Sequence, residues 1–427
     1  MARIKPIRGV RFSPHLIDEL DRLITPPYDV ISPEAQEAYY QKSPYNVIRL
    51  EYGKSLPDDR PGNDKYTRAA ATFQKWLAEG ALLQEKEPAL YLYEQHYRNH
   101  QQTYIRKGLY CGVGLSPFEA GEIVPHEKTM DKPKADRLEL LRHCEANFSP
   151  VFGLYRDKEQ FVAAASSSFK ENQKPVLDAE DEDGHLHRLW AVTDPGFIET
   201  ITGFFKDKNI FIADGHHRYE TALQFYLEKK KEGTEAPGYA HVLMALVNIY
   251  DEGLLVFPTH RLLKQEQIDS EHLLKELKHS FLIQELPEPG GPAHLQDLLA
   301  RNLTNNLRQL RLGLYTPGKK LYLLTFKERE RESNLYPWLD TVVLQEIIFS
   351  KIFALGDIEN SPALSYLKDE WEAKAKVDSG EANYAFFLTK PPLEKIIDLA
   401  GQGIRMPQKS TFFYPKFMTG IVIHKLS

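Results

Sequence analysis

Residues 214 to 218 have the sequence Asp-Gly-His-His-Arg, which joins a carboxylate, a glycine and three basic side chains in one short run. If a helix begins here, its first turn carries unpaired backbone N–H groups and about half a positive charge, which attract phosphate. Basic side chains at that end oppose the helix dipole, at a cost of roughly a few tenths of a kcal/mol. A bound anion or metal would resolve this conflict, whereas the alternative is that the histidines bond to neighbouring loops and seal a core. We predict ligand contacts from Asp214, Gly215, His216, His217 and Arg218.

A strand and a helix must position this run. Asn209 to Ala213 (NIFIA) has the composition of a short buried strand. His216 to Lys231 shows helical spacing of its apolar residues. Asp214 is predicted to cap this helix, and Gly215 to permit the tight turn before it.

Two pairs of reactive side chains lie earlier in the chain. His126 and Glu127 are adjacent, and an imidazole beside a carboxylate can serve as a general base or as a pair of metal ligands. Lys134 and Arg137 open a predicted helix and suit the phosphate of a nucleotide. The competing interpretations are an ordinary polar loop for the first pair and a solvated helix start for the second.

Two proline-bordered loops add candidates. In Thr25 to Ser32 (TPPYDVIS) two prolines stiffen the chain, so Asp29 would project from a rigid support. A turn before a helix that starts at the end of this loop fits equally well. Met406 to Lys416 (MPQKSTFFYPK) could contact a ligand, or it could form a β-hairpin. Its candidate contacts are Gln408, Lys409, Ser410 and Thr411.

The composition limits the class of protein. The 427 residues are 42% hydrophobic and 27% charged, which is typical of a soluble globular protein with two or three domains. A net charge of −6 argues against nucleic acid as the main partner. Two cysteines argue against a disulfide framework. Because the sequence has neither an apolar leader nor an apolar stretch of about 20 residues, we expect a cytoplasmic protein without membrane contact. The sequence predicts no oligomeric state.

Strand-like and helical patterns alternate along the whole chain. They predict an α/β or α+β protein with mixed sheets and interleaved helices. The helical patterns include Tyr66 to Glu79, Ser270 to Ser280 and Thr341 to Phe353. A polar break at Lys229 to Gly238 predicts an N-terminal part, residues 1–235, that ends in the DGHHR segment. Residues 236–427 would then form a C-terminal α+β part that contributes the MPQKSTFFYPK loop.

Six strings of the sequence, spread nearly from end to end, resemble the signature of one bacterial family. The family is uncharacterised and is catalogued as domain of unknown function 1015. The strings are ADGHHRYETAL (Ala213 to Leu223), TPPYDVIS (Thr25 to Ser32), PYNVIRLE (Pro44 to Glu51), HEKTMDKPKADRLELL (His126 to Leu141), SPVFGLY (Ser149 to Tyr155) and MPQKSTFFYPK (Met406 to Lys416). The chain is therefore identified as a member of that family.

DGHHR is also similar, more distantly, to the phosphate-binding motif of the ParB/sulfiredoxin superfamily. The resemblance implies a ParB/sulfiredoxin-like nucleotide-binding core with one or more additional domains. Sulfiredoxins carry a catalytic cysteine where this chain has His216, which excludes sulfinic acid repair. Chromosome-partition members have G-E-R-R at this turn, and their DNA-reading helices are not evident in this sequence. The free serine kinases, with the form D-G-[HN]-H-R, fit best.

Three functional hypotheses follow. The first is a kinase that uses ATP or ADP with Mg²⁺ to phosphorylate a small, serine-like hydroxyl compound. Its catalytic candidates are Glu127, His126, Asp29 and His217, and its Mg²⁺ ligands are Asp214 or Glu220. The second is a metal-dependent phosphohydrolase of a phosphorylated metabolite, with ligands from the same segment. The third is a nucleotide-responsive regulator that binds DNA or a protein partner.

Overall fold

The computed structural model describes residues 2–127, 131–171, 173–234, 236–265, 267–305, 309–327, 339–358, 361–390, 392–407 and 409–427. They divide into two compact units. Unit 1 comprises Met1–Pro125, Thr129–Leu255 and Pro415–Ser427, and unit 2 comprises His126–Lys128 and Val256–Tyr414. The chain thus leaves unit 1, builds most of unit 2 and returns. This division differs from the predicted boundary at residues 235/236, because the strand that follows the Lys229–Gly238 break joins the sheet of unit 1.

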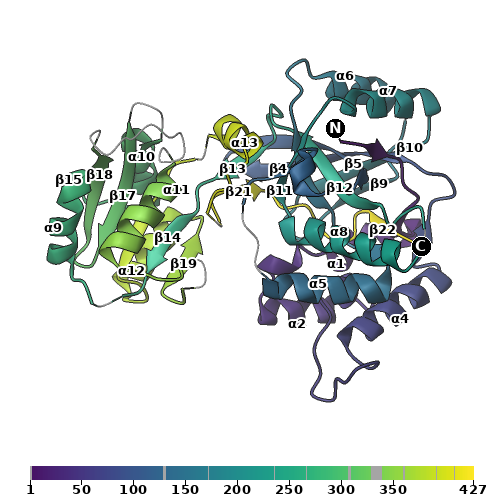
Figure 1. Cartoon of the computed structure of the whole chain (residues 1–427), viewed down its shortest axis with the longest axis horizontal. Helices are drawn as coiled ribbons and strands as arrows, with labels where there is room; N and C mark the ends of the chain where they lie inside the picture. The colour runs from purple at the N-terminus through teal and green to yellow at the C-terminus, as the bar shows by residue number, and fades with distance from the viewer. Residues whose placement is uncertain are drawn as a thin grey trace. The chain divides into compact units, whose positions relative to one another are not determined.

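Unit 1 is built on a mixed β-sheet with the strand order β6-β11-β8-β12-β5-β4-β10-β9, and β1 pairs with β5 (Figure 1). The strands are β1 (Ile4–Lys5), β4 (Leu90–Asn99), β5 (Gln102–Gly114), β6 (Ile123–Pro125), β8 (Val151–Tyr155), β9 (Leu177–Glu180), β10 (Leu186–Val192), β11 (Ile210–Asp214) and β12 (His241–Asn248). β11 runs parallel to β6 and antiparallel to β8. Every residue of β12 after His241 is buried, which is typical of a strand covered on both faces.

A smaller sheet and several helices complete unit 1. The sheet has the order β3-β2-β22-β7, with β2 (Gly9–Phe12), β3 (Leu82–Gln84), β7 (Ala146–Asn147) and β22 (Ile423–Lys425). The helices are η1 (Pro14–Glu19), α1 (Leu20–Leu23), η2 (Tyr28–Val30), α2 (Pro33–Lys42), α3 (Ile48–Glu51), α4 (Lys65–Ala78), η3 (Phe118–Ala120), α5 (Asp131–Cys144), α6 (Phe161–Lys170), α7 (Pro195–Phe205) and α8 (His216–Lys231). α5 and α8 lie side by side, and their apolar residues, such as Leu141 and Tyr219, pack into the main core (Figure 1).

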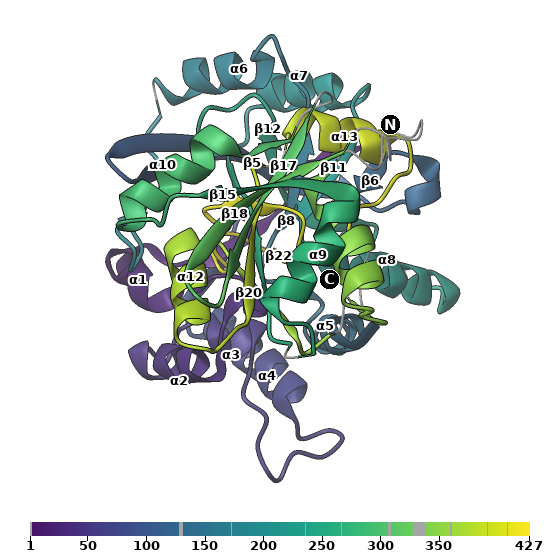
Figure 2. The ribbon, with the colours of Figure 1, turned by 90° about the vertical axis from the view of Figure 1, so that its left-hand side faces the viewer.

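Unit 2 is built on an antiparallel sheet with the order β15-β18-β17-β20-β14-β19, and β16 pairs with β17 (Figure 2). Its strands are β14 (His260–Leu263), β15 (Phe281–Leu286), β16 (Thr304–Asn305), β17 (Leu310–Thr316), β18 (Lys320–Phe326), β19 (Leu364–Leu367) and β20 (Tyr384–Phe387). A short pair, β13 (Leu255–Phe257) and β21 (Phe412–Tyr414), lies apart from this sheet. The helices are α9 (Ser270–Ser280), α10 (Pro292–Asn302), α11 (Asp340–Val343), the π-helix η6 (Leu344–Ile352), α12 (Glu370–Asp378) and α13 (Leu393–Gly401).

Helices cover both faces of the unit 2 sheet because its strands alternate their side chains between two cores. In β20, Tyr384 and Phe386 pack with α9 and η6, whereas Ala385 and Phe387 pack with α10 and α12. Figure 2 shows α9 on one side of the sheet, with α10 and α12 on the other.

The predicted fold class, an α/β or α+β protein with mixed sheets and interleaved helices, is confirmed. The predicted helix at residues 270–280 has the observed bounds of α9, whereas the pattern at residues 341–353 is divided between α11 and η6. Ser32 caps α2, because its Oγ accepts from the amide of Ala35 at 3.2 Å. Within the described residues, every helix is too short or too polar to cross a bilayer.

One partly buried carboxylate of unit 1 opposes folding near neutral pH. Burial raises the pKa of Asp251 to about 6, although the Gly253 amide and Lys107 act in the opposite direction. This folded-state pKa exceeds the unfolded value of about 3.9, so ionisation destabilises the fold as the pH rises from about 4 through 6. We expect Asp251→Asn to be more stable than the wild type by about 2 kcal/mol at pH 7 and equally stable below pH 4. Urea unfolding at the two pH values measures this, and a pH-independent difference would contradict it.

Candidate functional site

The strand, turn and helix predicted around DGHHR are present in unit 1. β11 ends at Asp214, Gly215 has a φ of 88°, and α8 begins at His216. Glycine adopts this left-handed backbone without the steric cost that a side chain brings. A Cβ at Gly215 would also lie 2.8 Å from Nε and 2.9 Å from Cζ of Arg218. The turn therefore requires glycine both for its backbone angle and for the space that Arg218 occupies.

The predicted role of Asp214 as helix cap is wrong. The N-cap is Gly215, which has no side chain to accept a bond from the first turn. The carboxylate of Asp214 instead binds two cations. Nη2 of Arg218 donates to Oδ2 at 2.7 Å, and Nζ of Lys416 donates to Oδ1 at 2.7 Å. We call these three side chains the Asp214–Arg218–Lys416 cluster.

The cluster carries a net positive charge in a partly buried place. The side chains of Asp214, Arg218 and Lys416 are 17%, 11% and 14% exposed. Burial alone would raise the pKa of Asp214, but the charges of Lys416 and Arg218 outweigh burial and lower that pKa. The carboxylate is therefore ionised at neutral pH, and two positive charges face one negative charge. The cluster lies at the N-terminus of α8, the positive end of the helix dipole, where a bound anion is favoured.

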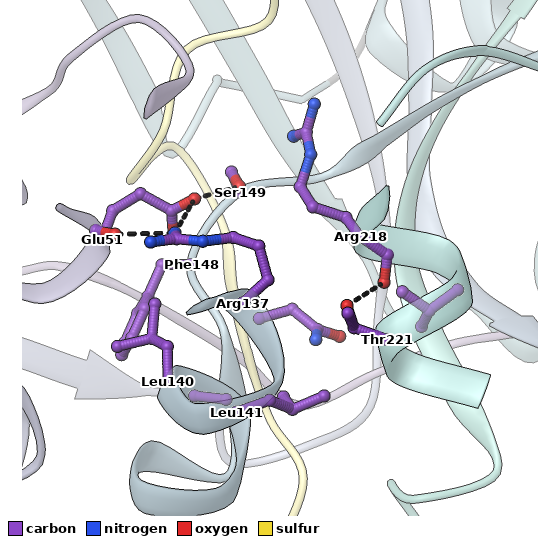
Figure 3. A pocket seen from close by; sticks show the side chains of 11 residues that line it. Glu51, Arg137, Leu140, Leu141, Phe148, Ser149, Arg218 and Thr221 are labelled. Atoms are coloured by element: carbon purple, nitrogen blue, oxygen red, sulfur yellow. Dashed lines mark hydrogen bonds and ion pairs between the residues drawn. The ribbon is translucent and has the colours of Figure 1, made fainter. Parts of the chain in front are cut away.

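A cavity of about 40 Å³ lies beside Arg218. Figure 3 shows its labelled lining residues, which include Glu51 from α3, Arg137 from α5, Ser149 and Thr221 from α8. Four of the six strings noted in the sequence thus converge on this cavity. Ligand pockets commonly measure roughly 300–1,000 Å³, so it has no room for a nucleoside.

A buried ion pair forms one wall of this cavity. Nη1 of Arg137 lies 3.4 Å from Oε1 of Glu51, which also accepts from Oγ of Ser149 at 2.9 Å (Figure 3). Burial raises the pKa of Glu51, and the charge of Arg137 acts against this rise. Arg137 also donates to Asp136 at 3.0 Å and lies 4.1 Å from the ring of Tyr28. These contacts fix the guanidinium at the cavity wall.

A protein-family model matches most of the chain. Residues 4–343 match the family model described as "Protein of unknown function (DUF1015)". The chain belongs to this family. The resemblance noted in the sequence is thereby confirmed. No curated protein matches this chain.

Three solved structures are similar to about three quarters of this chain. A free serine kinase variant in complex with AMP has 13% identity and a TM-score of 0.36, and the match covers 74% of this chain and 91% of that one. A conserved hypothetical protein from Pyrococcus furiosus has 14% identity, a TM-score of 0.35 and coverages of 74% and 95%. C-terminally truncated SbnI from Staphylococcus aureus has 9% identity, a TM-score of 0.35 and coverages of 73% and 86%.

Lys416 is the cluster residue that sequence reasoning missed. It is 202 residues from Asp214 in the sequence and belongs to the segment that returns to unit 1. The one available signal was its position as the last residue of the string MPQKSTFFYPK. Glu51, at the end of PYNVIRLE, was missed in the same way.

The other predicted residues of unit 1 lie in different settings. Lys134, a predicted phosphate contact, pairs with Glu220, a predicted Mg²⁺ ligand, at 3.0 Å. His216 is buried, and His217 is half-buried in the same first turn of α8. Asp29 is exposed on η2. The roles predicted for these residues stay predictions, which substitution of each residue can test.

The remaining predicted residues form a cluster of their own in unit 2. Nε2 of His126 lies 3.0 Å from Oγ1 of Thr411 and 3.4 Å from Oε1 of Glu127. Oε1 of Glu127 accepts from the amide of Ser410 at 3.2 Å. The side chain of Lys409 is exposed, and Gln408 lies outside the described residues. Residues 126–127 and 410–411 therefore meet in space.

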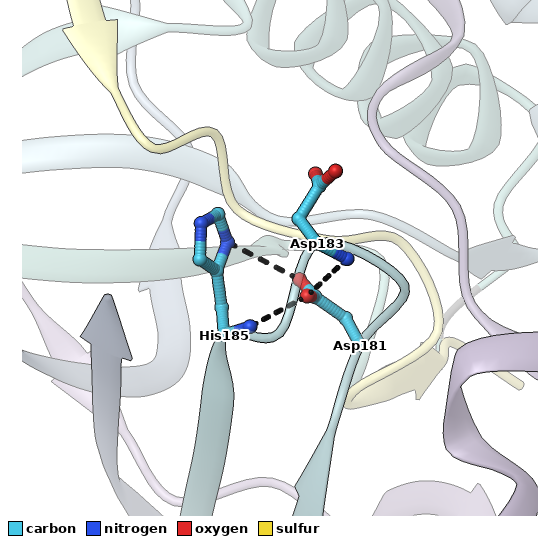
Figure 4. Close-up of side chains that lie close together, drawn as sticks. All are labelled: Asp181, Asp183 and His185. Atoms are coloured by element: carbon cyan, nitrogen blue, oxygen red, sulfur yellow. Dashed lines mark hydrogen bonds and ion pairs between the residues drawn. The ribbon is translucent and has the colours of Figure 1, made fainter. Parts of the chain in front are cut away.

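A carboxylate–imidazole group lies in the turn between β9 and β10 (Figure 4). The potential ligand atoms of Asp181, Asp183 and His185 lie within 4.8 Å of one another. Oδ1 of Asp181 accepts from the amides of Asp183 and His185, and its Oδ2 lies 3.0 Å from Nε2 of His187. Both oxygens of Asp181 are thus occupied by contacts that close the turn, and we interpret this group as structural.

Proposed function

We propose that this protein binds the phosphate groups of ATP or ADP at the N-terminus of α8 and transfers a phosphoryl group to a small, serine-like hydroxyl compound. The observation that carries the proposal is the Asp214–Arg218–Lys416 cluster. The reaction class comes from the resemblance of DGHHR to the motif of free serine kinases.

The charges of the cluster support phosphate rather than a cation as its ligand. Arg218 and Lys416 share the single carboxylate of Asp214, which holds both cations at the turn before α8. Bonds from a guanidinium or an ammonium to phosphate are stronger than neutral ones, especially in a site with restricted water. Gly215 leaves the space in which the guanidinium of Arg218 lies.

The same ion pairs disfavour a site in which protein ligands surround a transition metal. Asp214 contacts two cations, and Glu220 pairs with Lys134. Mg²⁺ usually keeps several waters and needs one or two carboxylates besides the substrate phosphates. We therefore propose that Mg²⁺ arrives with the nucleotide and that Asp214 or Glu220 supplies at most one oxygen. The predicted catalytic roles of Glu127, His126, Asp29 and His217, and the predicted contacts by Lys409 and Thr411, stay predictions.

Ligand-induced stabilisation tests nucleotide binding. With ATP or ADP and Mg²⁺ at 100 times Kd, the wild type should gain about 2.7 kcal/mol of unfolding free energy. Arg218→Ala should lose this gain. Arg142→Ala is the matched control. Arg142 lies on α5, is 40% exposed, and contacts α8 only through Glu228, which is near the C-terminal end of that helix. Equal responses of the two variants, or no response of the wild type, would contradict nucleotide binding at α8.

Product formation tests the reaction itself. Wild-type protein incubated with nucleotide, Mg²⁺ and serine or related hydroxyl compounds should release a phosphorylated product, detectable by mass spectrometry. Absence of nucleotide turnover with every amino acid and polyol tested would reject the kinase assignment while leaving nucleotide binding intact.

A further inference from the structure

A second cavity of unit 1 plays no part in the proposed function. It measures about 220 Å³, and its wall includes Arg49, Lys54, Lys65 and Arg68 beside the ring of Tyr40. We call it the four-cation pocket. The described residues that line it include no carboxylate. A solute entering this pocket therefore meets positive charge from α3, from the loop after it and from α4.

Acidic residues outside the pocket wall fix three of these cations. The ion pairs are Arg68–Asp59, Lys65–Asp136 and Lys54–Glu37. The side chains of Lys54, Lys65 and Arg68 remain 29%, 22% and 34% exposed. Their charges are thus positioned before a ligand arrives yet accessible from the solvent, which reduces the entropic cost of binding.

Arg49 is held in the pocket wall by Tyr40. Its Cζ lies 4.5 Å from the centre of the Tyr40 ring, and its Nη2 donates to the carbonyl oxygen of Tyr40 at 2.7 Å. Its Nε is buried and has no hydrogen-bond partner among the described residues.

We propose that the four-cation pocket binds a compact polyanion, a small molecule with two or more phosphate or carboxylate groups. Its volume is below the range of roughly 300–1,000 Å³ that drug-sized ligands occupy, so a diphosphate or a tricarboxylate suits it. Nucleic acid fits poorly, because the cations converge on a small cavity and the whole chain has a net charge of −6. The proposal does not depend on nucleotide binding at α8.

Calorimetric titration of the full chain with inorganic pyrophosphate, and separately with citrate, tests the proposal at low ionic strength. The variants are Lys54→Gln and the double variant Lys54→Gln/Arg49→Gln. Lys65 is left unchanged because its partner Asp136 also binds Arg137 of the candidate site. Lys75→Gln is the control, since Lys75 also lies on α4 but is 68% exposed and does not line the pocket. Each lost charged contact should weaken binding about tenfold.

The results expected are binding of at least one probe by the wild type and by Lys75→Gln, with about tenfold weaker binding by Lys54→Gln. Preference for pyrophosphate over citrate would assign a phosphate ligand, and the reverse preference a carboxylate ligand. Arg218→Ala should bind the probe as the wild type does, whereas Lys54→Gln should keep its response to ATP. Wild-type protein that binds neither probe, a folded double variant that binds as tightly as Lys75→Gln, or loss of probe binding in Arg218→Ala alone would overturn the proposal.

Discussion

Replacing Asp214 with alanine is expected to lower the free energy of unfolding by about 3 kcal/mol at pH 7, because two partly buried cations lose their common carboxylate. Urea unfolding measures the loss. Asp178→Ala is the matched control: Asp178 also pairs with an arginine, Arg188, but their side chains are 44% and 37% exposed. Exposed pairs contribute about 0–1 kcal/mol, so this variant should stay close to the wild type.

The effect of Asp214 should also depend on pH. Its pKa in the folded state is lowered, since the charges of Lys416 and Arg218 outweigh burial. The stabilisation is therefore fully present above the unfolded pKa of about 3.9 and is lost as the pH falls below that value towards the folded pKa. The difference in stability between the wild type and Asp214→Asn should narrow below about pH 4. A difference that stays constant from pH 7 to pH 3 would contradict the ion-pair assignment.

Replacing Gly215 with alanine should abolish the response to nucleotide. The backbone at φ 88° disfavours a side chain by roughly 1–2 kcal/mol, and the new Cβ would displace the guanidinium of Arg218. Gly233→Ala separates the two effects, because Gly233 ends the same helix region with a φ of 69° but has open space around it. Both variants should lose stability, and only Gly215→Ala should lose stabilisation by ATP or ADP in thermal unfolding. Equal ligand responses would show that Arg218 does not depend on this turn.

Local physics explains what the sequence could predict. β11 and α8 were predicted within a residue of their bounds, because a short apolar strand, a glycine and an apolar stripe at helical spacing lie within 23 consecutive residues, 209–231. The cap was predicted wrongly for a non-local reason. Aspartate is a favoured N-cap, but Lys416 and Arg218 compete for its carboxylate, and Lys416 comes from a distant segment.

Contacts between distant segments explain what the sequence could not predict. Glu51, Arg137 and Arg218 line one cavity, although they lie on three helices separated by many residues. Their strings were recognisable, but nothing in their spacing indicated that they meet. The sequence also did not reveal the division into two units. The break at residues 229–238 resembles a linker between domains, but the strand after it, β12, belongs to the sheet of unit 1.

The return of Pro415–Ser427 to unit 1 has a consequence for synthesis on the ribosome. β22 in this segment pairs with β2 and β7. These two strands therefore lack their pairing partner while Val256–Tyr414 is translated. At usual elongation rates this takes on the order of ten seconds. During that interval the nascent chain exposes unpaired strand edges, which favour aggregation and binding by chaperones. Lys416 also emerges after this delay, so a chain that has not been translated beyond residue 414 cannot yet assemble the Asp214–Arg218–Lys416 cluster.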